Sequence, residues 1–465
     1  MRWPCGPLEI ARRAKAEGFT AQAKQTLQRW QNPESLEILK GTPVNCLLVS
    51  WAAGLPQDTE QQRALVPLIE AGRRRGLSFV GWIEGSADQE AAIAAGKRAG
   101  LALVAWGDRA KTPWDSTAPV LPVSGNVWPG AQTGRGGGAS ANPTGLPWID
   151  SNSWFVQMAG ARTGVPIWLV FDPPGQPAVN LPERYVLAVL DSEAAGARWV
   201  VSLDDGLRAG LEGKESRAME TWKGITSALS FFENHKEWRS HQRLGVVGVI
   251  SDFSGANYDL NGEILNLMAR RHLCFRAIWK SRAMTTPFSG FKALVYADQE
   301  PPSKELRGKL LAFVEQGGLL VTGLKWRAEG APVAGDSHRR FELRALGKGR
   351  LAVAKEELAD AYLLAQDVHL LLSHSNDLLR LYNVRASGSN YSASPDGKKA
   401  LLQLVNYAGR DANSVSVWTK RRYRAAELWT IGAAAPAAVK PLPVFDGTEF
   451  HLPQTGSFAA LEFGI

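Results

Sequence analysis

Acidic side chains stand at the ends of several predicted strands in the first half of the chain, namely Glu84, Asp108, Asp172, Asp204 and Asp205. Cleavage of a glycosidic bond needs two carboxyl groups, one protonated to assist the leaving group and one ionised. In a barrel the fourth and seventh strand ends lie on opposite sides of the rim, so Glu84 and Asp172 are the candidate catalytic pair. Asp108 and Asp205 are candidates for binding the substrate. In the competing interpretation these acids cap helices or pair with arginines, and Asp172, which precedes two prolines, belongs to a turn.

Tryptophans mark the same strand ends. The chain has 17 of them, and four follow or end consecutive predicted strands: Trp51, Trp82, Trp106 and Trp128. The flat face of an indole ring stacks on the C–H face of a sugar ring. We therefore predict that these four tryptophans line a saccharide-binding rim. The alternative is that the indoles fill the core beneath the loops.

The distribution of histidine and cysteine argues against metal chemistry in this part of the chain. All 7 histidines lie at or after position 235, and the 3 cysteines are far apart in sequence. The first half therefore offers neither a histidine-ligated metal site nor a histidine general base, and the cysteines form no disulfide framework. The chain also lacks a G-x-S-x-G nucleophile turn. We predict no metal ion and no cofactor.

The elements that position these residues are most distinct over residues 76–108. Two short apolar strands, 77–82 and 101–106, flank a helix over 89–98. The same alternation runs through residues 1–240, where we count eight strand–helix units, with 19–27 as the weakest strand. Eight units in this length predict a (β/α)8 TIM barrel. A doubly wound sheet is the alternative, and it would suit fewer strands.

Two further domains follow the predicted barrel. A buried strand in LGVVGVISDFSG begins a second α/β pattern, and from about Leu378 apolar residues alternate with a period of two. The second pattern lacks the glycine-rich phosphate loops of nucleotide-binding domains. The predicted domains are the barrel over 1–240, a flavodoxin-like α/β domain over 241–340, a connector over 341–377 and an antiparallel β-sandwich over 378–465.

Charge and hydropathy exclude other classes of function. The net charge of +8 is spread over the chain, which is typical of a solvated surface rather than of nucleic-acid binding. No apolar stretch approaches membrane-spanning length, so we expect no membrane partner. The opening MRWPCGPLEIARRAK lacks the apolar core of a signal peptide. We expect a cytoplasmic protein, or a periplasmic or secreted one if a leader has been removed.

Several stretches carry a resemblance to a known family. They are LGVVGVISDFSG, FSGFKALVYADQE and LLAFVEQGGLLVTG in the second domain and ALLQLVNYAGRDANSVSVW in the last. With this domain order, the chain resembles the family 42 β-galactosidases, whose middle domain is similar to a class I glutamine amidotransferase that has lost its nucleophile. The resemblance implies a retaining glycosidase with glutamates after strands four and seven. It also implies a homo-oligomer built through the middle domain.

Two positions depart from the pattern of that family. Glu84 matches the acid by position but follows Ile83 where the family has asparagine, and Asp172 stands where the family has glutamate. A shorter carboxylate widens the gap between the two groups, which favours an inverting arrangement or no catalysis. We expect a glycoside hydrolase acting on a neutral saccharide, with Glu84 as general acid and Asp172 as nucleophile or base. The alternative is a non-catalytic carbohydrate-binding protein on a degenerate glycosidase scaffold.

Overall fold

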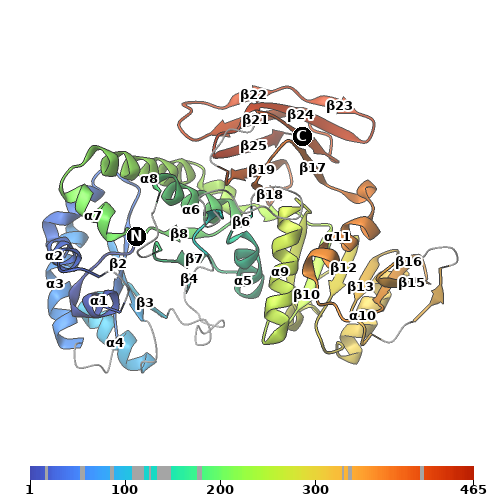
Figure 1. Cartoon of the computed structure of the whole chain (residues 1–465), viewed down its shortest axis with the longest axis horizontal. Coiled ribbons are helices and arrows are strands. Elements are labelled where there is room, and N and C mark those ends of the chain that lie inside the picture. The colour runs from blue at the N-terminus through green and yellow to red at the C-terminus, as the bar shows by residue number, and fades with distance from the viewer. Residues whose placement is uncertain are drawn as a thin grey trace. The chain divides into compact units, whose positions relative to one another are not determined.

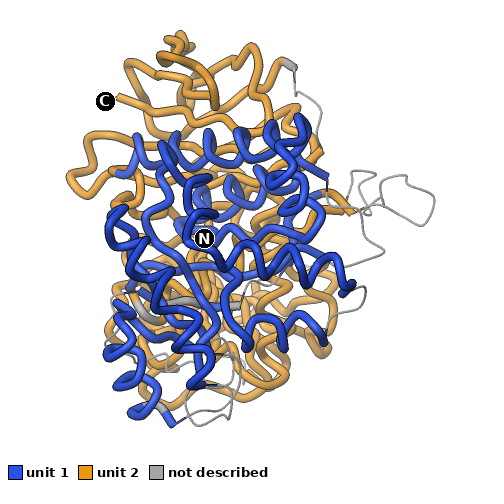
Figure 2. The backbone as a smooth tube through the Cα atoms, turned by 90° about the vertical axis from the view of Figure 1, so that its left-hand side faces the viewer, with its two compact units in different colours: residues 1–130, 165–236 blue, residues 131–164, 237–465 orange. Residues whose placement is uncertain are grey.

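The computed structural model divides the chain into two compact units, each made of two separate stretches of sequence (Figure 2). Unit 1 comprises residues 1–130 and 165–236, and unit 2 comprises residues 131–164 and 237–465. The residues that the structure describes are 1–15, 19–52, 58–83, 88–106, 120–124, 127–132, 148–174, 181–326, 329–333, 338–408 and 413–464.

Unit 1 is built on two three-stranded parallel sheets, in the orders β1-β2-β3 and β4-β7-β8 (Figure 1). Its strands are β1 (Cys46–Ser50), β2 (Ser78–Ile83), β3 (Leu103–Trp106), β4 (Leu121–Ser124), β7 (Ile167–Val170) and β8 (Arg198–Val200). Its helices are α1 (Gly6–Arg13), α2 (Ala21–Trp30), η1 (Pro33–Leu39), α3 (Asp58–Arg74), α4 (Gln89–Ala99), α6 (Pro182–Ala195), α7 (Asp205–Glu212) and α8 (Ser216–Asn234).

The start of the chain links these two sheets. The backbone N–H of Arg2 donates to the carbonyl of Val201, just after β8, and that of Trp3 donates to Leu48 in β1, each at 2.8 Å. Alternate side chains of both sheets also meet in one buried cluster: Leu48, Val80, Trp82, Ala105, Val170 and Val200. The two sheets therefore enclose a common core.

The described part of unit 1 is not a closed eight-stranded barrel, and one predicted strand is a helix. Residues 19–27, predicted as the second strand, fall largely in α2, whose Thr20 side chain accepts a hydrogen bond from the N–H of Ala23 as an N-cap. The buried positions of α2 are Ala23, Thr26, Leu27 and Trp30, a helical spacing. The prediction of a strand here was wrong, because the few apolar residues of 19–27 recur every three to four positions, as on one face of a helix.

The first part of unit 2 is a seven-stranded sheet in the order β11-β10-β12-β13-β16-β15-β14. The first five of these strands are parallel, and β15 and β14 are antiparallel. Helix α10 packs its buried Leu306, Leu310 and Val314 against one face. These strands are β10 (Val247–Ser251), β11 (Phe275–Trp279), β12 (Ala293–Tyr296), β13 (Leu319–Thr322), β14 (Ala331–Pro332), β15 (Phe341–Leu346) and β16 (Gly349–Ala354). The helices are α9 (Ala256–Arg270), η3 (Lys280–Arg282), α10 (Lys304–Glu315) and α11 (Ala361–Leu372).

Two stretches of unit 2 differ from the expected domain organisation. Residues 341–377, expected to be a connector, supply β15, β16 and α11 to this region. Residues 131–164, expected to belong to the first domain, form part of unit 2. They include α5 (Ser153–Thr163), which contacts α9 and β11, and the short strand β6 (Ile149–Asp150), which pairs with β5 (Gly130–Ala131).

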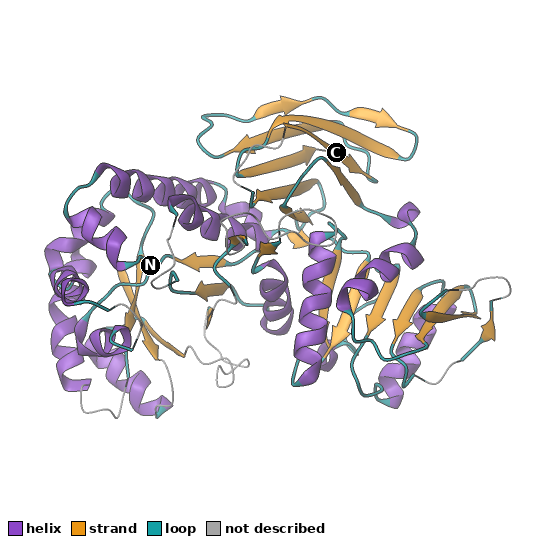
Figure 3. Cartoon of the chain, viewed as in Figure 1, coloured by secondary structure: helices purple, strands orange, loops and turns teal. Residues whose placement is uncertain are grey.

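The end of unit 2 consists of two antiparallel sheets, in the orders β17-β20-β24-β23 and β22-β21-β25-β19-β18-β9 (Figure 3). Both contribute to one apolar cluster that includes Val417, Phe450, Leu402 and Phe463, as in a sandwich. The strands are β9 (Gln242–Arg243), β17 (Leu379–Tyr382), β18 (Ser387–Ala393), β19 (Lys399–Asn406), β20 (Asn413–Thr419), β21 (Ala425–Thr430), β22 (Ala437–Val439), β23 (Leu442–Val444), β24 (Gly447–Gln454) and β25 (Phe458–Gly464), with short helices η2 (Lys236–Ser240) and η4 (His374–Asn376). No helix among the described residues is both long enough and apolar enough to cross a bilayer.

Candidate active site in unit 1

Polar side chains gather where three parallel strands of unit 1 end. Asp172 lies two residues beyond β7, Ser202 two residues beyond β8, and Ser50 is the last residue of β1. In parallel α/β folds, ligands bind at the carboxyl ends of the strands. The predicted site residues are therefore expected to lie along this edge of the sheets.

Asp172 is held by three side chains. Ser202 Oγ donates to Asp172 Oδ1 at 2.6 Å, and Arg12 Nη1 donates to Oδ2 at 2.5 Å. Arg2 Nη1 lies 3.7 Å from the same Oδ2. The Asp172 side chain keeps 24% of its surface exposed, whereas Arg2 keeps only 5%. Asp172 is thus a partly accessible carboxylate at the boundary between a buried charge network and solvent.

These contacts fix the charge of Asp172. Burial would raise the pKa of its carboxyl, but Arg2, Arg12 and the Ser202 hydroxyl together hold that pKa well below its usual range. Asp172 is therefore ionised at neutral pH. An ionised carboxylate can act as a nucleophile or base, whereas a general acid must carry a proton.

Glu9 is a second carboxylate in this network, and the sequence analysis missed it. It lies in the first turn of α1, is 1% exposed, and accepts hydrogen bonds from Arg12 Nη2 at 2.6 Å and from Ser50 Oγ at 2.7 Å. Burial opposes its charge, but Arg2 and Arg12 lower its pKa below the usual value. Arg12 therefore joins Glu9 to Asp172. The signal in the sequence was the pair E-x-x-R in the first predicted helix.

The acids after β8 are engaged in a helix cap and in ion pairs. Asp204 caps α7 by accepting the N–H of Leu207 at 2.7 Å, and it also accepts the Tyr185 hydroxyl at 2.6 Å. Asp205 pairs with Arg13 at 2.7 Å and with Arg208 at 3.0 Å. Asp205, predicted to bind substrate, thus sits in an ion-pair network beside the Asp172 cluster.

Trp51 and Trp82 lie on opposite faces of the first sheet. Trp82 belongs to the cluster enclosed by the two sheets and is 3% exposed. Trp51 is 2% exposed and donates its indole N–H to the carbonyl of Ala92 in α4 at 3.1 Å. Both indoles are therefore packed in the protein interior.

Trp128, another of the predicted site residues, belongs to an aromatic cluster on the side of α6. Its ring is 5.2 Å from Tyr185, 5.7 Å from Trp199 and 6.5 Å from Phe171, centre to centre. Phe171 directly precedes Asp172. Trp128 is 9% exposed, so its indole is largely buried within this cluster.

The other predicted site residues are placed as follows. Trp106 ends β3 and is half-buried, and its indole N–H has no hydrogen-bond partner within the part of the chain that the structure describes. Glu84 and Asp108 lie outside the described residues. The structure therefore brings Asp172 and Asp205 to one region, together with Glu9 and Arg12.

Comparisons with known proteins place the fold. No protein-family model matches the chain, and no curated protein matches it in sequence. Among solved structures it is similar to α-L-fucosidase isoenzyme 2 from Paenibacillus thiaminolyticus, with a TM-score of 0.59 and 13% identity over 96% of each chain. It is also similar to exo-β-1,4-mannosidase Op5Man5 from Opitutaceae bacterium strain TAV5, with a TM-score of 0.50 and 11% identity over 75% of this chain and 91% of that one. A GH42 β-galactosidase from G. stearothermophilus matches with a TM-score of 0.43 and 12% identity over 88% of this chain and 67% of that one. At such identities the likeness shows fold alone, and that fold is glycoside-hydrolase-like.

Proposed function

We propose that this protein is a glycoside hydrolase that acts on a neutral saccharide at the carboxyl ends of the parallel strands of unit 1. In this proposal the strands of unit 1 form a barrel of TIM type, unit 2 holds a flavodoxin-like domain and a β-sandwich, and the domain order resembles that of the family 42 β-galactosidases. The saccharide is suggested by solved structures of similar fold, which include a fucosidase and a mannosidase.

The observation that carries the proposal is the state of Asp172. It is an ionised and partly exposed carboxylate two residues beyond a parallel strand. A glycosidase needs such a group to attack the anomeric carbon or to activate water. We assign Asp172 this role and Glu84 the role of general acid. Trp106, Asp108 and Asp205 would then shape the binding site, whereas the buried indoles of Trp51, Trp82 and Trp128 belong to the core.

One observation favours a non-catalytic alternative. Both oxygens of Asp172 are already engaged, one by Ser202 and the other by two arginines. Asp204 and Asp205 are likewise held in a cap and in ion pairs. A scaffold that keeps its acids for structure could still bind sugars without cleaving them. The second candidate function is therefore a carbohydrate-binding protein on a glycosidase fold.

The deciding experiment measures turnover and binding by the same full-length protein. Aryl α-L-fucosides, β-galactosides and β-mannosides, with matching oligosaccharides, are tested against wild type, Glu84→Gln and Asp172→Asn. We expect each variant to lose about 10²- to 10⁴-fold in kcat, the contribution of a positioned acid or base, while saccharide binding persists. Glu37→Gln is the control, because Glu37 is an exposed acid of unit 1 with 61% of its side chain accessible.

The outcomes separate the two proposals. Loss of turnover in both site variants, with Glu37→Gln at the wild-type rate, supports the glycosidase. Saccharide binding without turnover by wild type overturns the glycosidase in favour of the binding protein. Neither binding nor turnover of any sugar in the panel would overturn both.

A further inference from the structure

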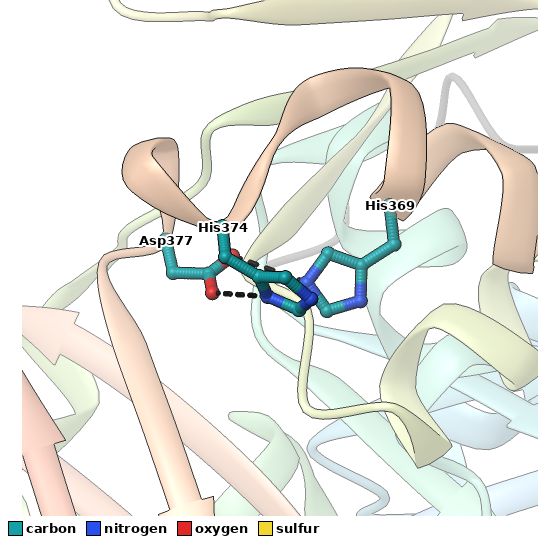
Figure 4. A group of neighbouring side chains, drawn as sticks. All are labelled: His369, His374 and Asp377. Atoms are coloured by element: carbon teal, nitrogen blue, oxygen red, sulfur yellow. Dashed lines mark hydrogen bonds and ion pairs between the residues drawn. The ribbon is translucent and has the colours of Figure 1, made fainter.

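Three side chains that can ligate a metal ion meet at the end of α11 in unit 2 (Figure 4). His369 lies in the last turn of that helix, His374 begins η4, and Asp377 follows η4 directly. One nitrogen or oxygen from each lies within 4.8 Å of the other two. This cluster was not among the sequence-based predictions, which included no metal ion, although the chain contains the spacing H-x4-H-x2-D.

The backbone between the two histidines turns the second ring back toward the first. Ser373 has φ 69°, in the left-handed region that side chains other than glycine's adopt rarely. Asn376 Nδ2 then donates to the carbonyl of Leu372 at 2.7 Å, which closes the end of α11. As a result the rings of His369 and His374 lie with their centres 4.6 Å apart.

Both rings address the same carboxylate. His369 Nε2 is 3.1 Å from Asp377 Oδ1, and His374 Nδ1 is 2.9 Å from Oδ2. Four-coordinate Zn²⁺ has bonds of about 2.0–2.2 Å to nitrogen and oxygen, which places neighbouring ligand atoms roughly 3.3–3.5 Å apart. The two nitrogen–oxygen separations are close to that spacing, and all three ligand atoms lie within 4.8 Å of one another. Asp377 is 4% exposed and His374 is 64% exposed. The carboxylate is therefore buried, whereas solvent and ions can reach the His374 side of the cluster.

Arg380 orients the carboxylate of this cluster. Its Nε donates to Asp377 Oδ2 at 3.0 Å, and its guanidinium lies over the Trp418 ring at 4.1 Å. Outer groups that hold a ligating side chain in place are usual around metal sites. The positive charge of Arg380 also lowers the affinity for a cation, so we expect weaker binding than in a structural site with four protein ligands.

We propose that His369, His374 and Asp377 bind a divalent transition-metal ion of the zinc type. Two imidazoles and one carboxylate suit Zn²⁺ and its neighbours, whereas Mg²⁺ and Ca²⁺ prefer oxygen ligands. Three protein ligands leave one coordination position to water or to an added ligand. The ion would tie the last turn of α11 to the start of β17, and this assignment is independent of the saccharide site in unit 1.

The test is Zn²⁺ binding by the full-length protein, measured by equilibrium dialysis and calorimetry after treatment with a chelator. Wild type should bind one Zn²⁺ per chain, and His369→Ala and His374→Ala should each weaken binding at least tenfold. The matched control is His451→Ala, because His451 is also in unit 2 and has 58% of its side chain exposed. Excess Mg²⁺ should leave the bound Zn²⁺ in place.

A second readout reports the ligands themselves. Co²⁺ added to wild type should show the visible d–d absorption bands of a four- or five-coordinate ion. These bands should disappear in His374→Ala and remain in His451→Ala. His374 is the exposed member of the cluster, so its variant is expected to fold normally, which circular dichroism would verify. No Zn²⁺ bound by wild type, or equal binding by His374→Ala, would overturn the proposal. Equal loss in His451→Ala would overturn it as well, because the ion would then bind elsewhere.

Discussion

At the scale of single residues, the defining feature of unit 1 is one arginine shared by two acids. Arg12 contacts Glu9, three residues before it, and Asp172, 160 residues further along the chain. Arg2 approaches both carboxylates and is nearly inaccessible to water. A buried arginine is tolerated only when its charge is compensated. The carboxylates therefore maintain the local fold as well as offering chemistry.

Replacing Asp172 should cost stability in a pH-dependent way. We expect Asp172→Asn to lower the free energy of unfolding by about 1–3 kcal/mol at pH 7, since Arg2 and Arg12 lose a charged partner. The native pKa of Asp172 lies below its ordinary value of 3.8, so the stabilisation is complete above pH about 4 and declines as the pH falls below that value. Urea unfolding at pH 7 and pH 3 would show the gap between wild type and variant becoming smaller in acid.

The control for this prediction is Glu37→Gln, whose side chain is exposed and makes only surface ion pairs. It should unfold like wild type at both pH values. An Asp172→Asn protein as stable as wild type at pH 7, or a gap that stays constant down to pH 3, would contradict the assignment of a low pKa.

Sequence reasoning located Asp172 but not the residues around it. A carboxylate directly after a buried apolar run is visible in one dimension, because strand ends have a local signature. The pairing with Arg2 and Arg12 depends on how the start of the chain packs near the end of β7. A contact between segments so distant in sequence cannot be predicted from a local sequence pattern. Ser202 was equally hidden, since a serine after a strand has many roles. The position of Asp172 at a strand end was thus predictable from the sequence, and the side chains around it were not.

At the scale of elements, the packing of α4 on its sheet rests on two glycines. A Cβ at Gly81 would lie 2.9 Å from Trp51 Cβ, and a Cβ at Gly96 would lie 2.5 Å from Val104 Cγ2. Real Cβ atoms do not approach so closely. The absence of these side chains leaves the space in which the Trp51 indole lies between sheet and helix.

Gly96→Ala should therefore destabilise the protein even though alanine favours helices. We expect a loss of about 1–3 kcal/mol, typical of overpacking, because Val104 is a stiff β-branched residue on β3. Gly308→Ala in α10 is the matched control, since nothing lies within 4 Å of its added Cβ. That control should gain about 0.5–1 kcal/mol from helix propensity. Urea unfolding measures the change in the free energy of unfolding of each variant. A Gly96→Ala protein more stable than wild type would refute the packing argument.

The elements that were predicted well have strong local signals. Strands β1, β2 and β3 are apolar runs bounded by turn residues, and α4 has an Asp88 cap at its start and a left-handed Gly100 after its end. Helix α2 was missed because its short buried face is polar enough to resemble an ambiguous segment. The sheet made with residues 341–377 was missed because the pairing of β16 with β13 joins segments that are distant in sequence.

At the scale of the whole molecule, the chain passes between the two units three times, after residues 130, 164 and 236. Helix α5 lies in the sequence between parts of unit 1 but packs in unit 2. Trp279 donates its indole N–H to the Met158 carbonyl at 2.6 Å, and Trp154 meets the Tyr258 ring at 6.2 Å. A Cβ at Gly262 would lie 2.7 Å from the Trp154 ring, so that glycine admits the indole.

Calorimetry can test this division. If the two units unfold separately, Trp154→Ala should lower the transition of unit 2 only, because the indole is 9% exposed and its removal costs about 3–5 kcal/mol. Gly96→Ala identifies the transition of unit 1. Should Trp154→Ala lower the same transition as Gly96→Ala, α5 would belong energetically to unit 1, as the sequence-based boundary at residue 240 implied.

The position of α5 also bears on how the protein is made. Met158 leaves the ribosome 121 residues before Trp279, its hydrogen-bond partner. At synthesis rates of about 5–20 residues per second, that interval is roughly 6–24 s. During this time the side chains of α5 that are buried in the folded protein lack the native surface of α9 and β11, while the second stretch of unit 1 is still emerging. Slowing translation between residues 164 and 237 would lengthen that exposure, and a chaperone that binds short apolar helices would have its longest opportunity on this segment of the nascent chain.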